Sequence, residues 1–249
     1  MKILRFTIFI ISLFLCSCDH KGQNKHIGNI ADTLNYALKT EKEAEPIILN
    51  RCPNDSDVIL FMKNRDQDSF NNLCFRYLKS DSPFEVIFYA LVAVDKFNIS
   101  RGYAEFGSCL TKFFSYMSVS NHSKEIAIYF LQKGARNNNI CAERLDIICK
   151  DKEYPKLWLP NNKDGDPFIA LKVNTIKGSI KDYNKLKNAF YDNNQPELLI
   201  YYSFLMADRY NYVPAREDVI KSLKQAYKKY NLGEFGEDTK YFCSFFQED

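Results

Sequence analysis

The chain has 249 residues, of which 46% are hydrophobic and 15% aromatic, and its formal net charge is +3. Without Lys2 and Arg5, it keeps 32 basic and 31 acidic residues. Because nucleic acid is bound mainly through its phosphates and calls for a basic face, this near-neutral balance argues against a nucleic-acid partner.

The N-terminus predicts an export segment. A positively charged start precedes an apolar run over residues 6–15, which is too short to span a bilayer as a mature helix. The run closes with the letters LCSC at 15–18. This ending resembles the lipobox of bacterial lipoproteins, in which a cysteine thiol is acylated and becomes the first mature residue. The resemblance implies a signal peptide over 1–17 and lipid attachment at Cys18, since Leu15 is too bulky to precede an acylated Cys16.

A tether is expected between this lipid and the folded part of the chain. Residues 18–45 are polar, which is typical of a flexible linker, and residues 46–249 are expected to form a single α-helical domain. A lipid anchor holds a protein at a membrane without threading it through. We therefore expect a periplasm-facing lipoprotein on the inner or the outer membrane. The alternative is an ordinary cleaved signal peptide or a short uncleaved anchor.

The chain is similar to itself at an offset of 113 residues. Residues 88–98, FYALVAVDKFN, correspond to residues 201–211, YYSFLMADRYN, and the same register extends over copies at about 66–116 and 179–230. Each copy predicts three helices joined by turns, and strand patterns are scarce. The expected fold class is all-α, with an internal duplication.

The repeated stretch predicts a buried helix followed by its stop. Residues 86–94 and 198–207 are almost wholly apolar, which is typical of a helix enclosed by its neighbours. Asn98 and Asn211 tolerate the left-handed conformation that ends a helix. Ahead of the first helix, residues 82–85 (SPFE) have the spacing of a capping box with proline at the first helical position.

Four polar side chains at the ends of these helices are the candidate binding residues. They are Asp95, Asn98, Asp208 and Asn211. One interpretation places them along a ligand groove. The other assigns them to helix caps and turns, because Asp and Asn favour such positions.

Between the copies, residues 123–145 read SKEIAIYFLQKGARNNNICAERL, with Ala127, Gly134, Ala135 and Ala142 at helical spacing. This segment resembles the second half of a Sel1-like repeat, a relative of the tetratricopeptide repeat with small residues at close helix contacts. Residues 178–183, in which Ser179 and Asp182 are spaced as a capping box, resemble the opening of such a unit. The resemblance implies an irregular α-helical repeat array and specifies architecture more than activity.

Residues suited to catalysis are few. Acid–base chemistry near neutral pH most often uses histidine. His20 and His26 lie in the tether, and His122 stands alone before a helix expected near Ser123. No Gly-x-Ser-x-Gly elbow is present. The sequence therefore predicts a protein that is not an enzyme.

No metal or cofactor site is expected either. Residues 162–166 (NKDGD) suggest a calcium loop, but an EF-hand alignment puts Pro160 and Leu171 where ligands belong. Cys141 and Cys149 lack CxxC spacing and a nearby histidine, which argues against structural zinc. No phosphate-cradling glycine loop appears. The even number of cysteines after Cys18 fixes no disulfide pairing.

The lysines near the C-terminus have an ordinary explanation. Four of them lie at helical spacing beside Glu217 and Asp218, which is typical of a solvated helix face: Lys221, Lys224, Lys228 and Lys229.

We therefore expect a membrane-tethered protein-binding lipoprotein, because helical repeat arrays bind protein or peptide over extended surfaces. By analogy with Sel1-like helical lipoproteins, its sharpest form is an immunity protein that neutralises a toxic effector in the periplasm. The first alternative is a scaffold lipoprotein of an envelope complex. The second is a glycan hydrolase, which needs only two carboxylates flanking a cleft.

Overall fold

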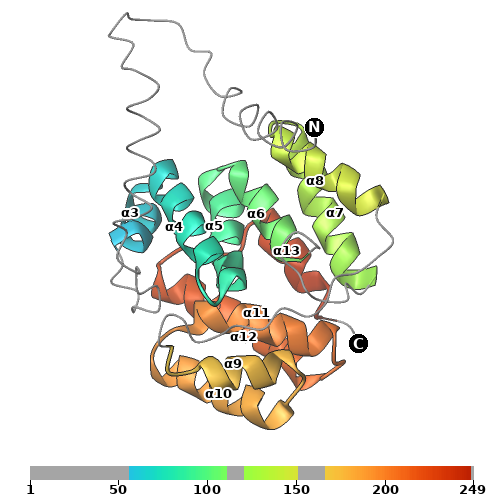
Figure 1. Cartoon of the computed structure of the whole chain (residues 1–249). Coiled ribbons are helices and arrows are strands. Elements are labelled where there is room, and N and C mark those ends of the chain that lie inside the picture. The colour runs from blue at the N-terminus through green and yellow to red at the C-terminus, as the bar shows by residue number, and fades with distance from the viewer. Residues whose placement is uncertain (1–55, 111–120, 151–165, 248–249) are drawn as a thin grey trace, which may run out of the picture. The chain divides into compact units, whose positions relative to one another are not determined.

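The computed structural model describes residues 56–110, 121–150 and 166–247, all within the compact unit Pro46–Asp249 (Figure 1). The expected signal peptide, Cys18 and the tether lie outside these ranges, as do residues 111–116 of the first copy and the loop at 162–165. Over the described ranges the regular structure is entirely helical, which confirms the all-α class. None of the described helices is both long and apolar enough to cross a membrane.

The helices follow one another along the chain in this order: α3 Ser56–Asn64, α4 Gln67–Lys79, the 3-10 helix η1 Pro83–Val86, α5 Ile87–Phe97, α6 Arg101–Cys109, α7 Asn121–Ala135, α8 Asn139–Lys150, α9 Ile169–Ile176, α10 Ile180–Asp192, α11 Pro196–Asp208, α12 Pro214–Lys229 and α13 Glu237–Ser244.

Helix boundaries recur at the offset of 113 residues seen in the sequence. Helices α4 and α10 begin and end at equivalent positions, and the starts of α3 and α6 correspond to those of α9 and α12. Left-handed residues correspond too: Arg65 (φ 57°) matches Gly178 (φ 93°), and Asn98 (φ 55°) matches Asn211 (φ 50°). The correspondence therefore begins earlier than the two predicted copies, at α3 and α9.

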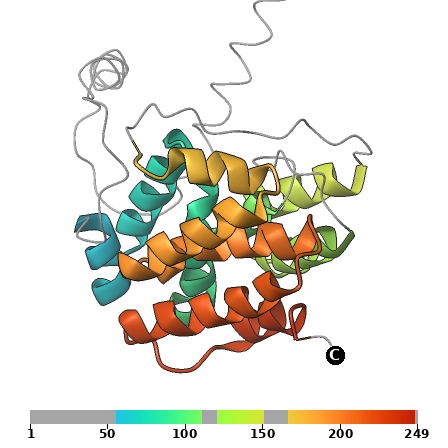
Figure 2. The same ribbon diagram turned by 90° about the horizontal axis from the view of Figure 1, so that it is seen from below.

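Helices α5 and α11 form the centre of the fold. Every residue from Ile87 to Val94 is buried, and α11 buries all but one of its residues from Pro196 to Ala207. The two helices contact each other, and α6 and α12 pack against them. Figure 2 shows α11 between α10 and α12. Because burial of one large apolar side chain contributes about 1.5–3 kcal/mol, these helices supply much of the core. The prediction of helices buried on every face is confirmed.

The predicted stops are also confirmed. In each copy, the amide of the residue after the left-handed asparagine donates to the carbonyl six residues earlier. The distance is 2.8 Å after Asn98 and 3.0 Å after Asn211. This closure satisfies carbonyls that the end of a helix leaves without a partner.

Of the two predicted capping boxes, one is wrong. Ser179 Oγ accepts a hydrogen bond from Asp182 N at 3.3 Å, as expected for the start of α10. Ser82 caps nothing with its side chain, although Pro83 opens η1 as predicted. The Glu85 carboxylate lies 2.7 Å from Lys172 Nζ in the interior. A buried ion pair, rather than a helix cap, accounts for this glutamate.

The segment that resembles a Sel1-like repeat forms helices α7 and α8, which pack against each other. A Cβ added at Gly134 would lie 2.4 Å from Cys141 Sγ and 2.6 Å from Tyr103 Cβ. Only glycine fits so close an approach, so the expected small-residue contact is present at this position.

Candidate binding site

Asp95, at the end of α5, holds the start of a helix far away in the sequence. Its carboxylate accepts hydrogen bonds from Gly236 N at 2.8 Å and Asp238 N at 3.2 Å, at the first turn of α13. Tyr227 OH also donates to it, at 2.9 Å. A carboxylate suits this place, because the first amides of a helix lack partners within the helix. A Cβ at Gly236 would lie 2.1 Å from Asp95 Oδ1, so the close approach requires glycine.

Asp208, at the equivalent end of α11, contacts the first turn of α7. Its Oδ1 lies 3.0 Å from His122 Nδ1, and Ser123 Oγ donates to its Oδ2 at 2.5 Å. Ser123 and Gly236 are separated by the same 113 residues as Asp95 and Asp208. Helix α5 of the first copy therefore supports α13, which follows the second copy. Helix α11 of the second copy supports α7, which follows the first copy.

These contacts favour the cap-and-turn interpretation of all four candidate residues. The two aspartates hold helix starts, and the two asparagines end helices in the left-handed conformation. One pocket nevertheless includes two of them. It has a volume of about 240 Å³ and is lined by His122, Ala207, Asp208, Asn211, Arg216, Phe245 and Phe246.

His122 and Asp208 form an oriented pair in this pocket of about 240 Å³, and such a pair can serve general-base catalysis. The Ser123 hydroxyl, however, donates its hydrogen bond to Asp208. None of the residues that line the pocket carries a hydroxyl or a thiol. The lining therefore offers this histidine no side-chain nucleophile to activate.

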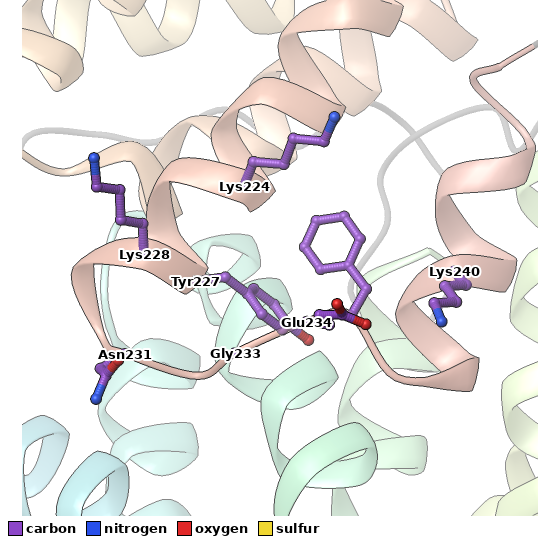
Figure 3. Close-up of a pocket in the computed structure, with 8 residues that line it drawn as sticks. Lys224, Tyr227, Lys228, Asn231, Gly233, Glu234 and Lys240 are labelled. Carbon is purple, nitrogen blue, oxygen red and sulfur yellow. The ribbon is translucent and has the colours of Figure 1, made fainter.

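The larger pocket lies between α12, the loop after it and α13 (Figure 3), and its volume is about 440 Å³. Its lining residues are Lys224, Tyr227, Lys228, Asn231, Gly233, Glu234, Phe235 and Lys240. In Figure 3, Lys224 and Lys228 extend from α12 and Lys240 from α13, on different sides of Tyr227 and Glu234.

Two aromatic rings provide the apolar part of this lining. The ring centroids of Tyr227 and Phe235 are 4.7 Å apart, and the rings meet edge to face at 79°. The Lys96 ammonium lies over the Tyr227 ring, 5.5 Å from its centroid, and donates to the Glu234 carbonyl. The hydrogen bond from Tyr227 OH to Asp95 holds this ring in place, and the residue is only 2% exposed, so Phe235 is the more accessible of the two rings.

The lysines of α12 have different environments, so the predicted solvated face is only part of the account. Lys229 donates to Glu197 Oε1 at 2.6 Å, and its side chain is only 12% exposed. Lys221 lies over the Tyr191 ring. Lys224 and Lys228 are exposed at the pocket, and neither forms an ion pair with any residue that the structure describes.

Three deeply buried charges form a cluster that the sequence did not predict. Lys172 Nζ lies 2.7 Å from Glu85 Oε1, 2.5 Å from Asp166 Oδ2 and 3.1 Å from Ser82 Oγ, and all three charged side chains are at most 4% exposed. Burial raises the pKa of Glu85. Burial opposes the charge on Lys172, but the two carboxylates outweigh it and raise the pKa of the ammonium. A lysine inside the apolar run IALKV of α9 is the feature that could have indicated this cluster.

Neither of these two pockets contains the pair of carboxylates that a glycan hydrolase needs. Glu234 is the acidic residue of the larger lining and Asp208 that of the smaller. Glu85 and Asp166 share one ammonium in the interior. Within the described ranges, no group of three or more His, Cys, Asp or Glu side chains could hold a metal ion.

The cysteines of the described ranges are free: Cys74, Cys109, Cys141, Cys149 and Cys243. Burial raises the pKa of the Cys141 thiol to about 11 and that of Cys243 to about 12. Since the thiolate is the reactive form, both act as small apolar side chains at neutral pH.

Comparisons with protein-family models, with curated proteins and with solved structures found no match. A functional proposal for this chain therefore depends on its own residues and their geometry.

Proposed function

We propose that this chain is a lipid-anchored, periplasm-facing protein-binding module of irregular Sel1-like or tetratricopeptide-like type, and that it is an immunity protein that neutralises a toxic effector. The observation that carries the proposal is the pocket between α12 and α13. There, two packed aromatic rings lie beside exposed lysines that have no ion-pair partner among the described residues. Aromatic side chains with nearby polar groups are typical of protein-binding surfaces.

The environments of the other charges support binding over catalysis. The buried acidic side chains already have internal partners: Glu85 pairs with Lys172, and Glu197 pairs with Lys229. Asp238 accepts hydrogen bonds from Tyr103 and Lys133. These carboxylates maintain the fold, whereas the lysines of the pocket are exposed and can pair with a partner.

The lipid anchor has a direct test. The full chain, expressed in bacteria with a radiolabelled fatty acid, should take up label, and Cys18→Ser should abolish the labelling. Cys16→Ser is the matched control and should keep it, because Leu15 before Cys16 does not suit the lipobox. Full labelling of Cys18→Ser, or its loss in Cys16→Ser alone, would contradict the assignment.

The immunity role is tested by survival. The product of a gene adjacent to this one, exported to the periplasm of a sensitive strain, should stop growth, and co-expression of the full chain should restore it. Protection should depend on the chain and be absent with the empty vector. If none of the adjacent products is toxic and the chain copurifies only with envelope components of its own cell, the scaffold alternative replaces the immunity role.

A further inference from the structure

We propose that the pocket between α12 and α13 binds an acidic peptide segment of the protein partner. An apolar or aromatic side chain of that segment packs on Phe235, which is partly exposed and rests against the buried Tyr227, and flanking carboxylates pair with Lys224, Lys228 and Lys240. This inference rests on the proposed function, in that it requires a protein partner, and it names the chemistry of the segment that is recognised.

Charge complementarity selects an acidic segment. Lys224 and Lys228 are four residues apart on one face of α12, and Lys240 reaches the pocket from α13 (Figure 3). Against these three ammonium groups, the lining contains one carboxylate, that of Glu234. The three lysines are exposed and form no ion pair with the described residues. Such an arrangement attracts and orients a negatively charged partner and repels a positively charged one.

The pocket is also held in place before a partner arrives. Asp95 binds Tyr227 OH on α12 and the amides of Gly236 and Asp238 at the start of α13. One carboxylate therefore ties together the two sides of the pocket. Because ordering a binding surface opposes association, a site that is already fixed binds more tightly than a mobile one.

A peptide accounts for the lining better than an anionic membrane does. Exposed lysines alone would suffice for attraction to lipid headgroups. The recess of about 440 Å³ and its two packed rings add a place for an inserted side chain, which a headgroup layer does not supply. Peptide recognition commonly combines such an anchor with charged flanks.

The test measures fluorescence anisotropy of short labelled peptides with the full chain in neutral detergent. The probe has a central phenylalanine flanked by aspartate and glutamate. One control peptide replaces the acids by lysine, and another replaces phenylalanine by alanine. The acidic phenylalanine peptide should bind more tightly than both, and Lys224→Glu with Lys228→Glu should raise its Kd about tenfold or more.

Lys181→Glu with Lys185→Glu is the matched control variant. These lysines are also exposed, four residues apart on one helix, α10, and without an ion pair among the described residues. Its Kd should stay within about twofold of the parent. An equal loss in both variants would show a general charge effect and would overturn the proposal, as would short-chain phosphatidylglycerol binding to the pocket where the peptide does not.

Failure of this inference is distinguishable from failure of the immunity role. If the Lys224→Glu and Lys228→Glu chain still protects cells and peptide binding is unaffected, the immunity role stands and the pocket is not its site. If the parent chain protects against no adjacent gene product, the immunity role fails, whatever the peptides show.

Discussion

Lys172→Met is expected to lower the free energy of unfolding by about 3–5 kcal/mol, because it leaves the buried Glu85 and Asp166 carboxylates without their ammonium. Methionine has a similar length, so the substitution removes charge with little change in packing. Urea denaturation of the full chain in detergent at pH 7 measures the loss.

The same variant should respond more steeply to pH. Lys172 is the largest of the influences that lower the pKa of Glu85, while burial raises it. Without the lysine, the pKa of folded Glu85 rises further above its unfolded value. A folded acid of raised pKa binds more protons than the unfolded chain, so stability falls as pH rises from about 4.3 through the folded pKa. Lys172→Met should therefore regain stability as the pH is lowered toward that unfolded value.

A neutral triple variant separates charge from packing. Lys172→Met combined with Glu85→Gln and Asp166→Asn leaves no buried charge, and Tyr202 OH can still donate to the side chain at position 85. Replacing a whole buried ion cluster is often close to neutral. The triple variant should recover most of the lost stability. An unchanged unfolding midpoint in Lys172→Met, or a triple variant less stable than the single one, would contradict this account.

Asp95→Ala should cost about 3 kcal/mol, because hydrogen bonds to charged groups contribute about 1.5–3 kcal/mol and buried donors lose their acceptor. Those donors are Tyr227 OH and the amides of Gly236 and Asp238. Asp192→Ala is the matched control, since this aspartate is exposed at the end of α10, and its effect should stay within about 0.5 kcal/mol.

Hydrogen exchange can show whether the two equivalent aspartates act on different helices. Asp95→Ala should speed amide exchange at the start of α13, and Asp208→Ala should do so at the start of α7. Asp95→Ala should also weaken binding of the acidic peptide, because Asp95 fixes both sides of the pocket. Exchange that rises equally in both helices in each variant would contradict the separate roles.

The parts of the fold that local chemistry determines were predictable from the sequence. Residues 86–94 and 198–207 are apolar on all faces of a helix, and this pattern predicted the buried helices α5 and α11. Asn98 and Asn211 predicted the stops, because few other residues adopt a positive φ. Ser179 predicted the start of α10, because its hydroxyl needs only a neighbour three residues away.

Contacts between distant residues could not be predicted in this way. Glu85 has the spacing of a capping box, yet its partner Lys172 lies 87 positions further along the chain. Similarly, nothing near Asp95 in the sequence indicates that it caps α13. The lysines of α12 have one helical spacing but separate environments, because Glu197 approaches Lys229 and leaves Lys224 and Lys228 at the pocket.

Calorimetric titration of the full chain, in detergent, with the purified toxic product of an adjacent gene measures whether this protein captures a toxic partner. Binding should be saturable at one partner per chain, weakened about tenfold or more by Lys224→Glu with Lys228→Glu and unchanged by Lys181→Glu with Lys185→Glu. Absence of binding to a product against which the chain should protect would contradict the claim that this protein acts by capturing a toxic partner.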